Sequence, residues 1–90
     1  MEFERIWAEQ CRAAQDIKRH FGVKDALDYL LSEKLVNFAE DADRHPEFAA
    51  EFPRFQAAVW DVFNPYEIAG YLGTLKPKQR NRLRRLLYIN

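Results

Sequence analysis

The chain of 90 residues is poor in the residue types from which many catalytic sites are built. Cys11 is its one cysteine, so no internal disulfide forms, and we expect a protein of the reducing cytoplasm. Its one serine, Ser32, lies within a helical pattern instead of on the sharp, glycine-flanked turn that exposes a catalytic serine. The three glycines are too far apart to make a phosphate-binding loop.

Metal ligands and catalytic pairs are equally sparse. His20, His45 and Cys11 stand far apart in the sequence, without the repeated spacing of a zinc site. The acidic residues within 40–43 lack the glycine and the closing glutamate of a calcium-binding loop. Nothing in the spacing pairs Cys11 with either histidine as a catalytic dyad. We therefore predict no catalytic, cofactor-binding or metal-binding residues, and we expect that the protein is not an enzyme.

Long hydrophobic runs are missing as well. No apolar segment approaches the ~20 residues that cross a bilayer, so we expect no interaction with a membrane. No segment alternates apolar and polar residues for long enough to predict a strand. The length suits one domain, and we expect a single helical domain over residues 1–90.

What the chain has in abundance is helical periodicity. The strongest pattern covers residues 25–42, where apolar side chains recur at steps of three and four. A stripe this broad is typical of a helix that packs against several neighbours, so we predict that this segment is the central helix. The stripe consists of Leu27, Leu30, Leu31, Leu35, Phe38 and Ala42.

Local signals mark helices on both sides of this segment. Apolar spacing predicts a first helix over 2–21, which Gly22 is suited to end. Pro46 is placed to open another helix, because proline is favoured at the first helical position. The apolar stripe then continues in phase across Pro53, which predicts a helix kinked near Pro53 or, alternatively, two short coaxial helices.

The last third of the chain carries the clearest local motif. Asn64 and Glu67, with a proline between them, form the pattern of a capping box at the start of a short helix. Gly73 is suited to end that helix, and Pro77 to open a final one. These signals together predict an all-α fold, a compact single-domain bundle of about five helices with the third helix kinked near Pro53 and no β-sheet.

Charge is unevenly distributed, although the net charge is zero. Residues 25–67 hold ten acids and three bases, whereas residues 68–90 hold six bases and no acid. This segregation indicates either that the basic segment packs on the acidic one or that it faces an anionic partner.

The function that we favour from the sequence is non-catalytic binding of another macromolecule. The partner would be another protein or a second copy of the chain, because the acidic face of one copy would attract the basic helix of another to form a homodimer or a head-to-tail assembly. The expected acidic residues of this surface are Asp41, Asp43, Glu47 and Glu51, and the aromatic residues expected to stay exposed are Trp60, Tyr66 and Tyr71.

The alternative is a nucleic-acid-binding regulator that uses residues 65–88. The first half of this segment resembles the opening of a helix-turn-helix, with Ala69 as the small residue that lets two helices approach and Gly73 at the turn. The second half departs from that motif, because Pro77 lies where the second helix should already be running. The residues that would contact bases or phosphates are Lys78, Arg80, Arg82, Arg84 and Arg85.

Overall fold

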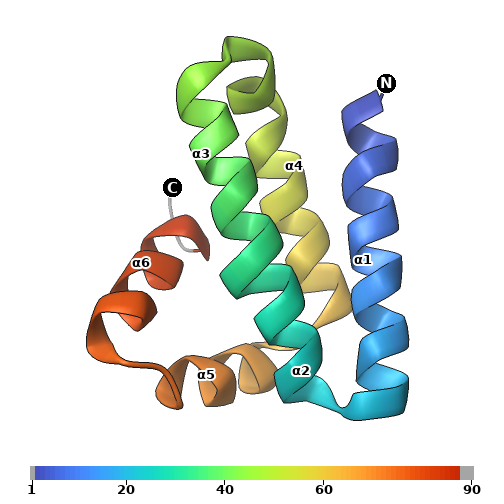
Figure 1. The fold of residues 1–90 in the computed structure, drawn as a ribbon, viewed down its shortest axis with the longest axis vertical. Helices are drawn as coiled ribbons and strands as arrows, with labels where there is room; N and C mark the ends of the chain where they lie inside the picture. The colour runs from blue at the N-terminus through green and yellow to red at the C-terminus, as the bar shows by residue number, and fades with distance from the viewer. Residues whose placement is uncertain (1, 88–90) are drawn as a thin grey trace.

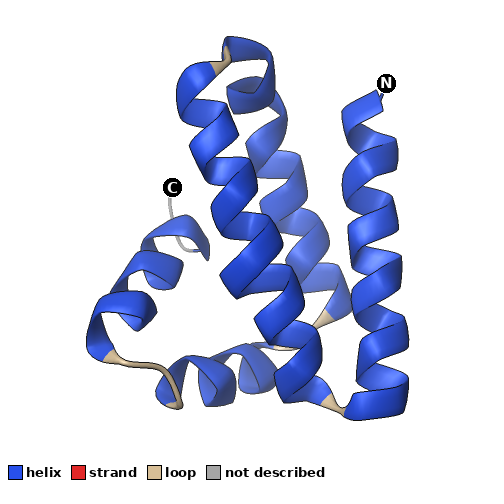
Figure 2. Cartoon of the chain, viewed as in Figure 1, coloured by secondary structure: helices blue, strands red, loops and turns tan. Residues whose placement is uncertain are grey.

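The computed structural model describes residues 2–87, with side chains from position 5 onward. Within that range the chain is almost entirely helical and has no strand, which confirms the predicted all-α fold (Figure 2). Three segments join end to end, so the described residues form five helical rods, as the sequence predicts. The segments are α1 (Glu2–Phe21), α2 (Val23–Leu27), the π-helical segment η1 (Asp28–Leu35), α3 (Val36–Arg44), α4 (Pro46–Val62), α5 (Pro65–Gly73) and α6 (Pro77–Leu87).

The central rod consists of α2, η1 and α3, which follow one another without a break (Figure 1). It contacts α1, α4, α5 and α6, as its broad apolar stripe predicts. The π-helical segment is not foreseen by the sequence pattern. Its hydrogen bonds run from residue i to i+5, so each turn holds more residues, and Leu30 and Leu35 are both carried into the core. The fully buried leucines of the rod are Leu27, Leu30, Leu31 and Leu35.

The helix ends fall where the local signals place them. Gly22 separates α1 from α2 with a φ of 100°, a conformation that favours glycine. Pro46 is the first residue of α4. The Asn64 side chain accepts a hydrogen bond from the Glu67 amide at 2.8 Å, and the Glu67 carboxylate accepts one from the Asn64 amide at 3.0 Å. The predicted capping box is therefore confirmed at the start of α5.

Helix α4 continues through its internal proline. It runs from position 46 to 62 as one element with Pro53 inside it, so the alternative of two short coaxial helices is wrong. Pro53 has no amide proton to donate to the preceding turn, which gives a physical reason for a bend there. The bend itself stays a prediction.

Aromatic side chains fill the core between α1, the central rod and α4. The Phe38 ring centroid lies 5.2 Å from that of Phe55 and 6.0 Å from that of Trp7, and Trp7 stacks on Phe55 at 6.2 Å. Such pairs contribute about 0.5–1.5 kcal/mol beyond the area that they bury. Phe21, the last residue of α1, is 72% exposed and stands outside this core.

The arrangement of the rods places α5 and the α3–α4 turn at opposite ends of the molecule (Figure 1). α1, the central rod and α4 stand side by side, α5 crosses one end of the rod, and α6 lies along its side. The radius of gyration is 12.5 Å, close to the about 12 Å expected of a compact chain of this length. Within residues 2–87, no helix combines the length and the hydrophobicity that crossing a bilayer requires.

Candidate functional site

Helix α6 presents three chemically different sides. The first side packs on the bundle, where Leu83 and Leu87, one helical turn apart, are buried. Next to this side, Arg82 Nη2 lies 3.0 Å from Glu40 Oε1 on α3. This contact joins one base of the basic segment to the acidic middle of the chain. Both side chains are about half exposed, so the pair contributes only about 0–1 kcal/mol.

The second side of α6 faces outward. Lys78 and Arg85 are seven residues apart, so they share a face of the helix, and both are exposed. Arg82, four residues after Lys78, borders this face on the side toward α3, where it pairs with Glu40. No carboxylate among the described side chains lies within ion-pair distance of Lys78 or Arg85. Lys78 and Arg85 therefore form an outer basic face that is open to solvent.

The third side of α6 borders a groove shared with α5. The groove has a volume of about 330 Å³, and Arg80, Asn81 and Arg84 line it from α6. The opposite wall belongs to α5 and consists of Ala69, Leu72 and Gly73. The charge pattern of the sequence does not point to Asn81, because its side-chain amide is neutral. Its place in the groove beside the arginines becomes clear only from the packing of α5 and α6.

The packing of α5 on α6 differs from that of a helix-turn-helix. Ala69 is exposed on the groove, so its expected role as the small residue at a close helix contact is wrong. A methyl group added at Gly73 would meet no atom within 4 Å, so close packing does not require glycine there either. The open groove lies between the two helices at the place where the motif would join them.

The acidic residues of the predicted surface gather around the α3–α4 turn. Asp41, Asp43 and Glu47 are exposed there, and we call these three residues the acidic tip. Asp41 lines a groove beside α1, whereas Asp43 lines a groove beside α4 and α6. The acids thus surround one end of the bundle and do not form a single flat face.

Glu51 does not belong to this exposed surface. It is only 8% exposed, so its predicted place among the surface acids is wrong. The reason is helical spacing, because Glu51 lies one turn before Phe55, which is 1% exposed, and α4 turns both toward the interior. It forms an ion pair with Arg54, whose Nη1 lies 3.8 Å from Glu51 Oε2.

Of the three aromatic residues expected at the surface, Tyr66 is the exposed one, at 88%. Trp60 is half-buried, and its Nε1 donates a 3.4 Å hydrogen bond to the Leu87 carbonyl oxygen, which joins α4 to the end of α6. Tyr71 is 4% exposed, so its predicted exposure is wrong. It shares the face of α5 that carries Ile68, and this face packs against the bundle.

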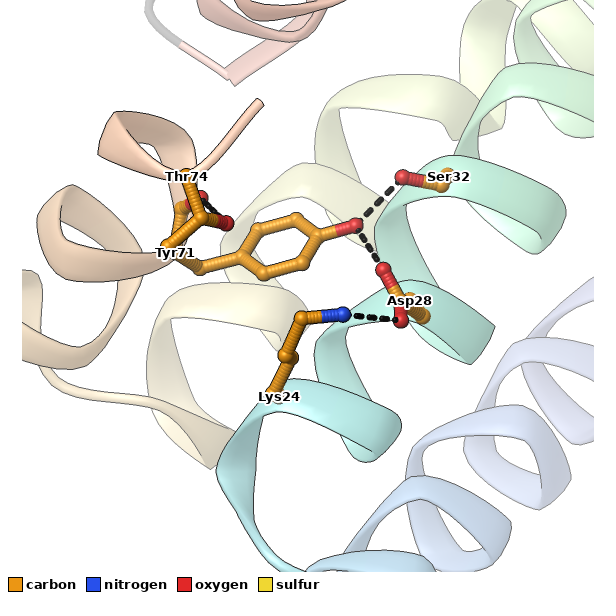
Figure 3. A network of polar contacts seen from close by, with 5 residues as sticks. All are labelled: Lys24, Asp28, Ser32, Tyr71 and Thr74. Carbon is orange, nitrogen blue, oxygen red and sulfur yellow. Dashed lines mark hydrogen bonds and ion pairs between the residues drawn. The ribbon is translucent and has the colours of Figure 1, made fainter. Parts of the chain in front are cut away.

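The Tyr71 hydroxyl joins α5 to the π-helical segment (Figure 3). It donates a 2.6 Å hydrogen bond to Asp28 Oδ1. Because its single proton is used there, the Ser32 hydroxyl donates to Tyr71 at 2.5 Å. Lys24 Nζ completes the cluster by donating to Asp28 Oδ2 at 3.2 Å. Burial, followed by the hydrogen bond to Asp28, raises the pKa of Tyr71 to about 12.

Cys11 and the two histidines are not brought together. Cys11 is buried, and burial raises the pKa of its thiol to about 11, with the charge of Asp61 adding to the rise. His20 lies further along α1, about 13 Å away along the helix axis. His45 lies at the α3–α4 turn, where its ring contacts Phe48. No group of three or more potential metal ligands occurs in the part of the chain that the structure describes.

Comparison of the chain with protein-family models, with curated proteins and with solved structures finds no match. The features of the molecule that bear on function are therefore the three sides of α6 and the acidic tip.

Proposed function

We propose that this protein acts by binding another protein through its charged surfaces, and that the partner is a second copy of the chain. The observation that carries the proposal is the separation of exposed charge. Lys78 and Arg85 form the outer basic face of α6, whereas the acidic tip surrounds the α3–α4 turn at one end of the bundle (Figure 1). A contact between two surfaces that lie apart on one chain joins two copies. We place this interaction in the cytoplasm, because the single buried cysteine suits a reducing compartment.

Such a contact is head-to-tail, because it joins different surfaces of the two copies. Contacts of this kind add further copies in a ring or an open chain. Exposed ion pairs are individually weak and are screened by salt. We therefore expect reversible association that grows with protein concentration and disappears at high ionic strength.

Sedimentation velocity at a series of protein concentrations, in low salt and in about 0.5 M salt, tests this proposal. We expect oligomers in low salt that dissociate in high salt. The double variant Lys78→Glu/Arg85→Glu reverses the outer basic face and is expected to stay monomeric in both. The matched control Arg12→Glu/Arg19→Glu makes the same change in net charge at exposed positions of α1, and we expect it to associate like the unmodified chain.

Two results would contradict the proposal. One is a chain that stays monomeric in low salt up to about 1 mM protein. The other is an equal loss of association in the α6 variant and in the α1 control, because net charge and not the outer basic face would then govern association.

A second candidate function is binding of the nucleic-acid backbone without reading of its sequence. It is supported by the four basic side chains of α6 for which the described residues supply no carboxylate, namely Lys78, Arg80, Arg84 and Arg85. Retardation of duplex DNA in a gel at about 50 mM salt, lost in Lys78→Glu/Arg85→Glu but kept in the α1 control, would favour it. No retardation at micromolar protein would count against it.

A further inference from the structure

The groove between α5 and α6 is lined by two arginines and by no acid. The grooves beside α1 and beside α4 differ from it, because each of them contains an aspartate. Arg80 is half-buried in the groove wall, and Arg84 is exposed at its edge. Asn81, between them in sequence, adds an uncharged side-chain amide that both donates and accepts hydrogen bonds.

The guanidinium groups of Arg80 and Arg84 repel each other in the chain without a ligand. Arg80 and Arg84 are four residues apart in α6, so their side chains are neighbours on one face, and like charges at this spacing repel each other. No ion pair with a described carboxylate relieves the repulsion of either residue. This contrasts with Arg82 on the neighbouring side of the helix, which has Glu40. An anion held between Arg80 and Arg84 would remove the repulsion and accept hydrogen bonds from both.

We propose that this groove binds the phosphate group of a small phosphate monoester. A monoester carries a charge of about −1.5 to −2 near neutral pH, which matches two arginines better than the single charge of a carboxylate does. The planar guanidinium group presents parallel N–H donors that fit phosphate oxygens in pairs, and Asn81 supplies a further donor.

The opposite wall of the groove favours a small organic molecule over a nucleic-acid strand. Ala69 and Gly73 are exposed on this wall, with the buried Leu72 behind them, so the surface across from the arginines is uncharged, and a ligand with a charged group and an uncharged body fits both walls. The volume of about 330 Å³ lies at the lower end of the range for small-molecule sites. Lys78 and Arg85, which a nucleic-acid strand would be expected to follow, lie on the outer basic face and do not line the groove.

Nuclear magnetic resonance titration of the full chain at about 0.1 M salt tests the proposal. The probes are adenosine 5′-monophosphate, adenosine, inorganic phosphate, and a short single-stranded oligonucleotide without a terminal phosphate. With adenosine 5′-monophosphate we expect saturable shifts of the Asn81 side-chain amide and of the backbone amides within 69–73. We expect weaker binding of inorganic phosphate, which lacks the uncharged body, and little binding of adenosine, which lacks the phosphate.

Two variants test whether the ligand binds in the groove, and a third variant serves as the control. Arg80→Gln/Arg84→Gln removes both positive charges with a residue that keeps the helix, and we expect affinity for adenosine 5′-monophosphate to fall by about tenfold or more. Ala69→Leu fills the groove while it keeps both arginines, and we expect a similar loss. The control Arg12→Gln/Arg19→Gln removes the same charge from exposed positions of α1 and should change affinity by less than about twofold. Far-ultraviolet circular dichroism checks that each variant stays helical.

Each remaining outcome would overturn the proposal. If adenosine 5′-monophosphate causes no saturable shift up to about 10 mM, the groove does not bind phosphate monoesters. Equal binding of adenosine, or an equal loss in the control variant, would show that the phosphate or the groove is not what is recognised. Inorganic phosphate binding as tightly as adenosine 5′-monophosphate would exclude a role for the uncharged wall. Tighter binding of the oligonucleotide, with shifts that reach Lys78 and Arg85, would assign the groove to a nucleic-acid surface. None of these results depends on self-association, which the proposed function assigns to the outer basic face.

Discussion

The Tyr71 hydroxyl is the polar connection between α5 and the central rod. Tyr71 is 4% exposed, and its hydroxyl lies between the Asp28 carboxylate and the Ser32 hydroxyl (Figure 3). A buried polar group that loses its partner raises the free energy of the folded state, because the group left behind has neither water nor a replacement. Single substitutions at this position therefore measure how firmly α5 is held.

Replacing Tyr71 with phenylalanine is expected to lower the free energy of unfolding by about 1–2 kcal/mol. The change removes the hydroxyl and its hydrogen bonds with Asp28 and Ser32, while the ring stays packed. Urea denaturation followed by circular dichroism measures the loss. The control Tyr66→Phe removes a hydroxyl from a side chain that is 88% exposed and should change the unfolding free energy little. Equal effects of the two substitutions would contradict the role of the buried hydroxyl.

The raised pKa of Tyr71 predicts that stability falls in strongly alkaline solution. Below pH 10 the hydroxyl is protonated in both states, so its contribution is fully present. Between pH 10 and about 12 the unfolded chain loses this proton while the folded chain keeps it, so the free energy of unfolding decreases as pH rises. Urea denaturation at several pH values measures the slope, which should be smaller in Tyr71→Phe. If the free energy of unfolding falls with pH equally steeply in Tyr71→Phe, the loss of stability does not come from the Tyr71 hydroxyl.

Cys11 is expected to be protected from thiol reagents in the folded chain. Its side chain is 8% exposed, and burial raises its pKa to about 11, so little reactive thiolate exists at neutral pH. The rate of modification by an aromatic disulfide reagent should be far lower in native buffer than in urea. Rapid modification of the native chain would show that Cys11 is accessible and reopen the possibility that it reacts.

The exposure of single residues is what the sequence predicts least well. Tyr66 and Tyr71 both lie in α5, yet one is exposed and the other is buried, because only the second faces the central rod. Glu51 is a charged residue that the turn of α4 carries inward beside Phe55. The partners of Tyr71 lie about forty positions earlier in the chain, so no local pattern predicts the cluster.

At the scale of whole elements, the start of α5 is the clearest case of a helix end that is fixed by neighbouring residues in the sequence. Asn64 and Glu67 exchange two hydrogen bonds, and Lys18 on α1 lies 2.9 Å from the Glu67 carboxylate. The hydrogen bond from Lys18, followed by that from the Asn64 amide, lowers the pKa of Glu67. The carboxylate is therefore ionised at neutral pH, and the capping box also ties α5 to α1.

Replacing Asn64 with alanine is expected to lower the free energy of unfolding by about 1 kcal/mol. The substitution leaves the Glu67 amide without its side-chain acceptor, while Glu67 and Lys18 remain. Thermal or urea denaturation measures the change. Asn37→Ala, at an exposed position within α3, is a suitable control because it removes the same side chain without removing a cap. If Asn64→Ala lowers the free energy of unfolding no more than Asn37→Ala does, the capping box does not contribute to stability as expected.

The limits of the helices can be read from proline, glycine and asparagine, but their internal geometry cannot. Gly22, Pro46, Asn64 and Pro77 each mark a boundary that the structure confirms, because each acts on its own stretch of backbone. The π-helical segment has no such marker. Its apolar residues recur at steps that also suit an α-helix, and the choice depends on the packing of the rod against four other helices.

At the scale of the whole molecule, the segregation of charge is predicted by the sequence, but its division into surfaces is not. The fold splits the basic segment into a side paired with Glu40, an outer basic face and a groove wall. It also removes Glu51 from the acidic surface and leaves Asp41 and Asp43 on different sides of α3. These divisions arise from tertiary contacts between segments that are distant in sequence. Binding of the outer basic face of one copy to the acidic tip of another, as we propose, therefore depends on the folded surface and not on the sequence segments alone.

Mixing two charge-reversed variants tests this proposed binding most directly. Lys78→Glu/Arg85→Glu gives a chain with an acidic α6 face and an acidic tip, and Asp41→Lys/Glu47→Lys gives one with a basic face and a basic tip. Sedimentation velocity in low salt should find each variant monomeric when it is alone. It should find association when the two are mixed, because each contact between one variant and the other then joins opposite charges. A mixture that stays monomeric while the unmodified chain associates, or variants that associate alone, would contradict the account.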